Sequence, residues 1–451
     1  MRLAEHFSKL RTKMMVVCLF LFLPIFLAVR NPEKLVFVCI IPVLIIFLLK
    51  PIIPLAAFVF LMPFETSLVG VDDFFSFMKI SGVIVSIVYF LNKTVKKGLP
   101  RIKDIPHAKL LLLFLGLMFI SAVFSIDREL SLAQYLTYLQ LFVLYVIIVD
   151  FVDNEPKLQY LITFLLIGGT ISGIYSIYNF YFARGALFGF SISREGGFLQ
   201  NANRFGYVQT LIFLFTFPYA INMRRRFYRV VSILLAAVIL FSSFLSLSRG
   251  VSLALVVTGG YAVIKLFRQR KISGGLLITL IIISVLLPVA YWERLDTIIY
   301  PDGLEGSRYV RLAFLQDGLR MGVNHPLMGV GLGRFNEEFL NVSNKAVFTL
   351  AGGAHNMYVS ILAENGIPAF VVFLLLVYNS LRKPMLYKNR TNTKLAYYSY
   401  GIELGMVFSL GIGCFATIEY SKMFWLLLAM CAVPERIVRQ RQKCGNVVIK
   451  T

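Results

Sequence analysis

The chain has 451 residues, of which 58% are hydrophobic and only 15% carry a charged side chain. Its mean hydropathy of +0.77 is far too apolar for a soluble globular protein, so composition alone indicates an integral membrane protein. The formal net charge is +22, which requires an explanation in a chain with so few charged residues.

Apolar runs long enough to cross a bilayer recur along the chain. A hydrocarbon core of about 30 Å requires about 20 apolar residues per helix. The predicted helices cover residues 14–29, 35–49, 51–64, 74–91, 108–125, 130–150, 158–182, 205–222, 230–247, 251–267, 274–292, 356–381, 395–415 and 421–434. Prolines interrupt the short runs 35–49 and 51–64, which leaves the existence of this pair open.

The fold class follows from the continuity of these runs. Lipid admits only helices and closed β-barrels as spanning structures, and barrel strands would alternate apolar and polar residues. The sequence therefore predicts an all-α polytopic membrane protein with about 12–14 transmembrane helices.

The distribution of lysine and arginine predicts the orientation, because short cytoplasmic loops carry the excess of both. With the N-terminus inside, the basic stretches 93–109, 224–226, 265–271 and 382–394 all face the cytoplasm, as does the C-terminal tail. The net charge then reflects topology and contact with anionic membrane lipids. Basic residues spread over many loops argue against binding of nucleic acid.

Cysteine placement predicts neither disulfides nor a metal site. Cys18, Cys39, Cys414 and Cys431 fall within predicted helices, and Cys444 falls in the tail. No outer segment offers a pair of thiols, and no Cys-His spacing suits zinc.

Two predicted outer segments, 183–204 and 293–355, depart from the charge rule. Their arginines are Arg184, Arg194, Arg204, Arg294, Arg308, Arg311, Arg320 and Arg334. The planar guanidinium fork suits bidentate contacts with phosphate or carboxylate groups, so these segments are candidates for an anion site. Ion pairs with the acidic residues of the same segments are the alternative; these are Glu195, Asp302, Glu305, Asp317, Glu337 and Glu338.

Arg249 is the only charged residue between Val230 and Lys265. It must lie at a tight outer turn between two helices or inside the bundle, and either position is costly without a partner. Ionisable groups at membrane depth are functional candidates, and an anionic substrate would supply the partner. An arginine that caps helix carbonyls remains the structural alternative.

The segment 293–355 has internal organisation. Residues 306–320 predict a helix along the membrane surface, in which Arg308 and Arg311 share one face and leucines recur at helical spacing. Pro326 is expected to end it, and the glycines of 329–333 predict a loop.

His355 is expected to begin the next membrane helix, with Tyr358 on the same face. Glu364 would then lie on the opposite face, about 13 Å deeper, as an intramembrane carboxylate paired with another helix. A histidine at a membrane surface is either a general base for a hydroxyl or a helix-capping group.

Together these residues resemble the O-antigen ligase and polymerase superfamily over roughly 195–380. The motifs, in order, are Gln200-Asn201-Ala202-Asn203, Ser248-Arg249-Gly250, the pair Arg308 and Arg311, His325-Pro326-Leu327-Met328-Gly329-Val330-Gly331-Leu332-Gly333, His355-Asn356-Met357-Tyr358 and Glu364-Asn365-Gly366. The resemblance implies a type C glycosyltransferase-like fold with one large periplasmic loop. It also implies a bacterial inner-membrane enzyme that transfers a glycan from undecaprenyl diphosphate to a sugar hydroxyl, with inversion and without cofactor or metal.

Carried over to this sequence, the resemblance implies that His355 is catalytic and that Arg249, Arg308 and Arg311 bind the diphosphate. Secondary candidates are Arg194, Asn203, Arg204, Tyr358 and Glu364. The family's ligase branch, with lipid A-core as acceptor, is favoured. A repeat-unit polymerase of O-antigen or exopolysaccharide is the alternative, and a lipid or glycan transporter is the third.

The expected organisation has six parts. They are N-terminal transmembrane helices (1–182), a periplasmic loop (183–204), central transmembrane helices (205–292), the large periplasmic loop (293–355), C-terminal transmembrane helices (356–434) and a basic cytoplasmic tail (435–451).

Overall fold

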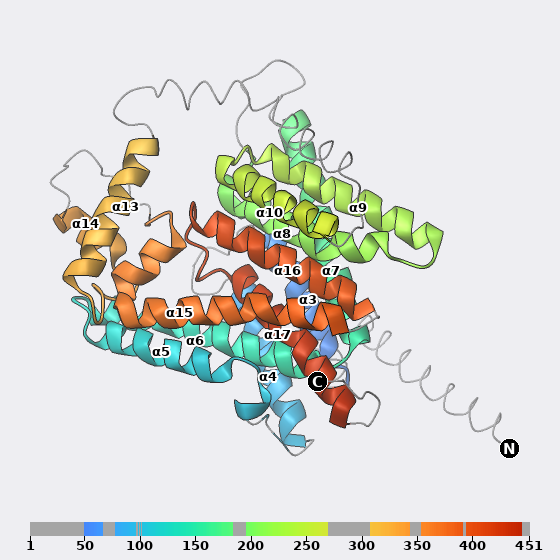
Figure 1. The fold of residues 1–451 in the computed structure, drawn as a ribbon, viewed down its shortest axis with the longest axis horizontal. Helices are drawn as coiled ribbons and strands as arrows, with labels where there is room; N and C mark the ends of the chain where they lie inside the picture. The colour runs from blue at the N-terminus through green and yellow to red at the C-terminus, as the bar shows by residue number, and fades with distance from the viewer. Residues whose placement is uncertain are drawn as a thin grey trace, which may run out of the picture. The chain divides into compact units, whose positions relative to one another are not determined.

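A computed structural model describes residues 49–65, 77–95, 98, 100, 102–183, 195–268, 307–342, 353–390 and 394–443, and within them it contains helices and no strands (Figure 1). Its α-helices are α3 (Ile52–Leu61), α4 (Phe77–Val95), α5 (Ala108–Val123), α6 (Arg128–Phe151), α7 (Glu155–Tyr178), α8 (Ala202–Ile221), α9 (Arg226–Leu245), α10 (Arg249–Arg268), α13 (Ser307–Asn324), α14 (Phe335–Val342), α15 (Met357–Arg390), α16 (Lys394–Gly413) and α17 (Lys422–Lys443). The predicted all-helical class is confirmed.

The chain forms two compact units. One comprises Met1–Leu55 with Ser81–Leu99, and the other comprises Ala56–Ile80 with Pro100–Thr451. Every helix from α5 to α17 lies in the second unit, as do all described residues proposed for the site.

Five of the described helices are long and apolar enough to cross a membrane: Arg128–Phe151, Glu155–Phe182, Arg226–Leu245, Arg249–Arg268 and Met357–Arg382. The chain is therefore a multi-pass membrane protein, as predicted. The predicted helices 14–29 and 274–292 lie outside the described residues, and of the predicted helix 35–49 only residue 49 is described.

The last helix differs from the expectation. Residues from 435 were expected to form a tail, but α17 continues to Lys443 because its arginines find partners on neighbouring helices. Arg436 pairs with Asp150 at 2.9 Å, and Arg441 pairs with Glu155 at 2.8 Å. These ion pairs tie the C-terminal end of α17 to the corner between α6 and α7.

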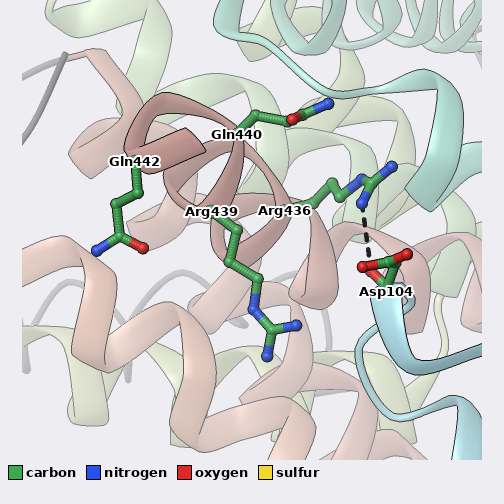
Figure 2. A pocket seen from close by; sticks show the side chains of 5 residues that line it. All are labelled: Asp104, Arg436, Arg439, Gln440 and Gln442. Carbon is green, nitrogen blue, oxygen red and sulfur yellow. Dashed lines mark hydrogen bonds between the residues drawn. The ribbon is translucent and has the colours of Figure 1, made fainter. Parts of the chain in front are cut away.

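A cavity of about 330 Å³ lies beside this end of α17 and is lined by Asp104, Arg436, Arg439, Gln440 and Gln442 (Figure 2). Figure 2 shows Arg436 pointing toward Asp104, whose backbone carbonyl accepts a hydrogen bond from it at 3.3 Å. Arg439 is paired with Glu435. Both arginines already have acidic partners, so we place the candidate site elsewhere.

The helix α15 is interrupted at Gly366, whose φ of 76° lies in the left-handed region. Pro368 has no N–H and cannot donate to the carbonyl of Glu364, so the helical hydrogen-bond ladder fails at this point. The N–H of Ile367 turns instead to the carbonyl of Pro326 at 2.7 Å. The carbonyls of Ala363 and Glu364 are consequently left without helical donors.

The loop between α13 and α14 supplies the missing donors. The N–H of Val330 donates to the carbonyl of Ala363 at 2.9 Å, and the N–H of Gly331 donates to the carbonyl of Glu364 at 3.1 Å. The glycine-rich loop of the sequence thus supplies the hydrogen-bond donors that the broken helix lacks.

Replacing Gly331 by alanine is expected to destabilise the protein by about 2–4 kcal/mol, since strain and crowding add. Gly331 has a φ of 113°, and a Cβ there would lie 2.1 Å from the Oγ of Ser125, which is buried and hydrogen-bonded to Ser131. Thermal unfolding in detergent measures the change. Gly116→Ala is the control, because a Cβ at Gly116 meets nothing within 4 Å. Equal melting temperatures for the two variants would contradict the proposed role of this loop.

Candidate functional site

Two helices outside the membrane-crossing set cover the start of α15 (Figure 1). The helix α13 approaches α15 closely, and a Cβ added at its Gly318 would lie 2.3 Å from Val359. A small apolar core joins α13, α14 and α15; its buried members are Ala313, Phe314, Met321, Val330, Phe335, Phe339, Ala354, Val359 and Ala363. The helix predicted over 306–320 is confirmed and extends to Asn324, whereas α14 was not predicted.

His355 does not begin the membrane helix, which corrects the expectation. It has a φ of 46° and lies two residues before α15 starts at Met357. Asn356 is the capping residue, because its Oδ1 accepts from the backbone N–H of Tyr358 at 3.0 Å and of Val359 at 3.1 Å. The imidazole is therefore placed by a cap rather than by helical periodicity, and it packs beside the ring of Phe314 with centroids 6.1 Å apart.

The charges around His355 identify its neighbours. Burial lowers the pKa of His355, and the positive charge of Arg311 lowers it further. Burial likewise lowers the pKa of Arg311, with a smaller effect from the charge of Arg249. Arg311 thus lies within electrostatic reach of both His355 and Arg249, and it forms no ion pair with any carboxylate in the described part of the chain.

These cations sit where helices begin. Arg249 is the first residue of α10 and is exposed, in agreement with the predicted tight turn, and Arg311 lies in the second turn of α13. A helix N-terminus carries partial positive charge and free N–H groups, so it favours an anion and disfavours a further cation. Arginine side chains at such ends make this region a candidate anion-binding site. Arg308 belongs to the first turn of α13, but the structure does not describe its side chain.

The motifs that contain Asn203 and Arg249 are joined. The hydroxyl of Ser248 donates to the Oδ1 of Asn203 at 2.8 Å and accepts from the N–H of Val251 at 3.4 Å, so Ser248 caps α10. Asn203 therefore positions the turn that carries Arg249.

Other predicted arginines have acidic partners. Arg334 pairs with Glu337 at 2.5 Å and with Asp127 at 3.5 Å, and Arg320 pairs with Asp317 at 3.0 Å. For Arg334 and Arg320, the structure therefore supports ion pairing with acidic residues, the alternative to an anion site.

Arg204 is also paired, with Glu65 at 2.5 Å, and Lys422 binds the other oxygen of the same carboxylate. Burial raises the pKa of Glu65, but the two cations outweigh this effect and the pKa is lowered overall. Arg194 lies outside the described residues.

Tyr358 and Glu364 bind backbone groups. The hydroxyl of Tyr358 donates to the carbonyl of Leu410 at 2.9 Å. The carboxylate of Glu364 accepts from the N–H of Gly333 at 3.0 Å, so its recorded partner is the glycine loop rather than another helix as expected. Both side chains hold the backbone around the site.

A loop that sequence reasoning missed also reaches the site. Residues 414–421 join α16 to α17, and the carbonyl of Cys414 accepts from the Nδ2 of Asn356 at 3.2 Å. A Cβ on Gly250 would lie 2.9 Å from the Cβ of Phe415. The loop therefore contacts both segments that carry the proposed site residues. Nothing in its sequence pattern signals this, because the contacts join residues more than 50 positions apart.

The described residues thus combine a multi-pass helical fold with a histidine and arginines near helix starts, which makes this region a candidate site for an anionic substrate. Residues 234–374, from within α9 to within α15, match the family model described as O-Antigen ligase. This match supports the O-antigen ligase superfamily, and the matched residues include Arg249, Arg311 and His355. No match was found among curated proteins. The match supports a membrane glycosyltransferase-like function of the O-antigen ligase or polymerase type.

Proposed function

We propose that this chain is an O-antigen ligase, which transfers a polysaccharide from undecaprenyl diphosphate to a sugar hydroxyl of lipid A-core. The observation that carries the proposal is the effect of the charge of Arg311 on the pKa of His355, and of the charge of Arg249 on the pKa of Arg311, within the residues that match the family. A lipid diphosphate presents its charge at the depth of the headgroups, which is where the ends of membrane helices lie.

In this mechanism the acceptor oxygen attacks the anomeric carbon of the donor sugar, and the bond from that carbon to the diphosphate oxygen breaks. His355 accepts the hydroxyl proton. Its lowered pKa keeps the imidazole neutral near pH 7, which is the form that a base requires. A single displacement inverts the anomeric centre.

The leaving group in this mechanism is undecaprenyl diphosphate, which gains negative charge as the bond breaks. Arg249 and Arg311, together with Arg308, would stabilise that charge by guanidinium contacts. The guanidinium groups supply the positive charge that this step needs, so the proposal includes neither metal nor cofactor.

The proposed location is the periplasmic side of a bacterial inner membrane, with both termini in the cytoplasm. The excess of lysine and arginine in the stretches 224–226 and 382–394 supports this orientation. The first stretch lies at the start of α9, whose other end leads into α10, and the second covers the C-terminal end of α15, opposite its start at Met357.

Deleting the gene and resolving the surface glycolipid of the host on a gel tests the function. For a ligase, full-length chains accumulate on undecaprenyl diphosphate and the core stays bare. Single repeat units on the core would instead identify a repeat-unit polymerase. Unaltered glycolipid would contradict both assignments, and restoration by the wild-type gene is the control.

A further inference from the structure

The loop 414–421 lies beside the site but outside the residues that match the family. It contacts the Arg249 segment through Phe415 against Gly250, and the His355 segment through the carbonyl of Cys414. Farther along the loop, a Cβ on Gly353 would lie 3.9 Å from the Oγ1 of Thr417. Thr417 is therefore placed next to the backbone that leads into His355.

Two hydroxyl groups of this loop form a pair. The Oγ1 of Thr417 and the phenolic oxygen of Tyr420 are 3.3 Å apart, and Tyr420 is 46% exposed. Each hydroxyl can both donate and accept, as sugar hydroxyls do. A half-exposed tyrosine also offers an apolar ring face together with a polar tip.

A positive charge accompanies this hydroxyl pair. Arg204 is close enough to Tyr420 to act on its charge, and its side chain is 36% exposed. Arg204 and Lys422 share the single carboxylate of Glu65, so this cluster carries one excess positive charge. The loop itself contains one carboxylate, that of Glu419. Burial raises the pKa of Glu419 to about 8, so this group is largely uncharged at neutral pH.

We propose that Thr417 and Tyr420 bind the acceptor glycan through its hydroxyl groups, beside the ion-paired cluster of Arg204, Lys422 and Glu65. This inference rests on the proposed function, because it assigns the acceptor side of the same reaction. The donor diphosphate would be held by the arginines of α10 and α13, while the acceptor approaches His355 over the loop 414–421. The choice of acceptor then depends on residues outside 234–374, the part of the chain that matches the family.

The test uses the purified full-length protein, with lipid-linked polysaccharide as donor and lipid A-core as acceptor. Thr417→Val and Tyr420→Phe each remove one hydroxyl with little change of shape. Each is expected to raise the KM for the acceptor about tenfold, the equivalent of one hydrogen bond, and to leave the KM for the donor unchanged. Thr163→Val and Tyr378→Phe are the matched controls, because these residues lie on α7 and beyond the break in α15.

An unchanged KM for the acceptor, in variants that melt like the wild type, would overturn the proposal. So would a rise in the KM for the donor alone, which would assign the loop to the donor site. Direct binding of lipid A-core to the His355→Ala protein separates this inference from the proposed function. A tenfold loss of binding on adding Tyr420→Phe supports the inference independently of turnover, and equal binding contradicts it.

Discussion

Replacing His355 by alanine is expected to lower kcat by about 10²–10⁴-fold, the usual contribution of a general base. The protein should remain folded, because the cap that starts α15 is made by Asn356 and not by the imidazole. Turnover is measured with purified protein, lipid-linked donor and lipid A-core. His325→Ala is the matched control, since His325 is exposed in the turn after α13. Wild-type turnover by the His355 variant would eliminate the proposed base.

The pH dependence of the wild-type enzyme offers a second measurement of the same group. A base acts only when it is unprotonated, so activity is present above its pKa and is lost as the pH falls through it. Burial and then Arg311 lower the pKa of His355, so the acidic limb of the kcat/KM profile should lie below the ordinary histidine pKa of 6.5. A limb above 6.5 would show that another group limits the rate.

Replacing Arg311 by glutamine is expected to lower kcat/KM by about 10²–10³-fold, as removal of one group that stabilises developing negative charge does in other enzymes. Because its charge acts on His355 and it is affected by the charge of Arg249, Arg311 is the central cation of the proposed site. Arg320→Gln on the same helix is the control, because Arg320 is exposed and already paired with Asp317. Equal losses in the two variants would indicate general damage to α13 instead of a specific loss.

The Arg311 variant also carries a signature that a structural defect would not produce. Without the neighbouring positive charge, the protonated imidazole is less disfavoured and the pKa of His355 rises. The acidic limb of kcat/KM should therefore move to higher pH in Arg311→Gln and stay in place in Arg320→Gln. A limb that does not move would separate Arg311 from His355.

The positions of the helices could be predicted from the sequence, because apolar runs report burial in lipid directly. The ends were less predictable, since they depend on partners distant in the chain. Residues after 434 read as a basic tail, yet Asp150 and Glu155 hold Arg436 and Arg441 in a continued helix. The short helix α14 has apolar residues at helical spacing, Phe335, Phe339 and Val342, but its eight residues are too short a run for the pattern to identify a helix.

The candidate site could be predicted in its chemistry but not in its geometry. Arg249 stood out as a lone charge in an apolar stretch, and the structure places it at the turn that was one of two expectations. The facing of Glu364 relative to His355 assumes that both residues lie on one helix, but His355 has a φ of 46° and precedes the start of α15 at Met357. The loop 414–421 could not be found at all, because its relation to His355 exists only through tertiary contacts.

The hydrogen bonds between the α13–α14 loop and α15 have a consequence for biogenesis. Val330 and Gly331 find their acceptors on a helix that follows them in the chain, and Phe314 and Met321 find apolar neighbours there. The segment 307–342 therefore depends on α15 for its hydrogen-bond acceptors and for part of its apolar core. During synthesis it must await insertion of α15 before its backbone and core are satisfied, so the site is assembled late, when the last third of the chain has entered the membrane.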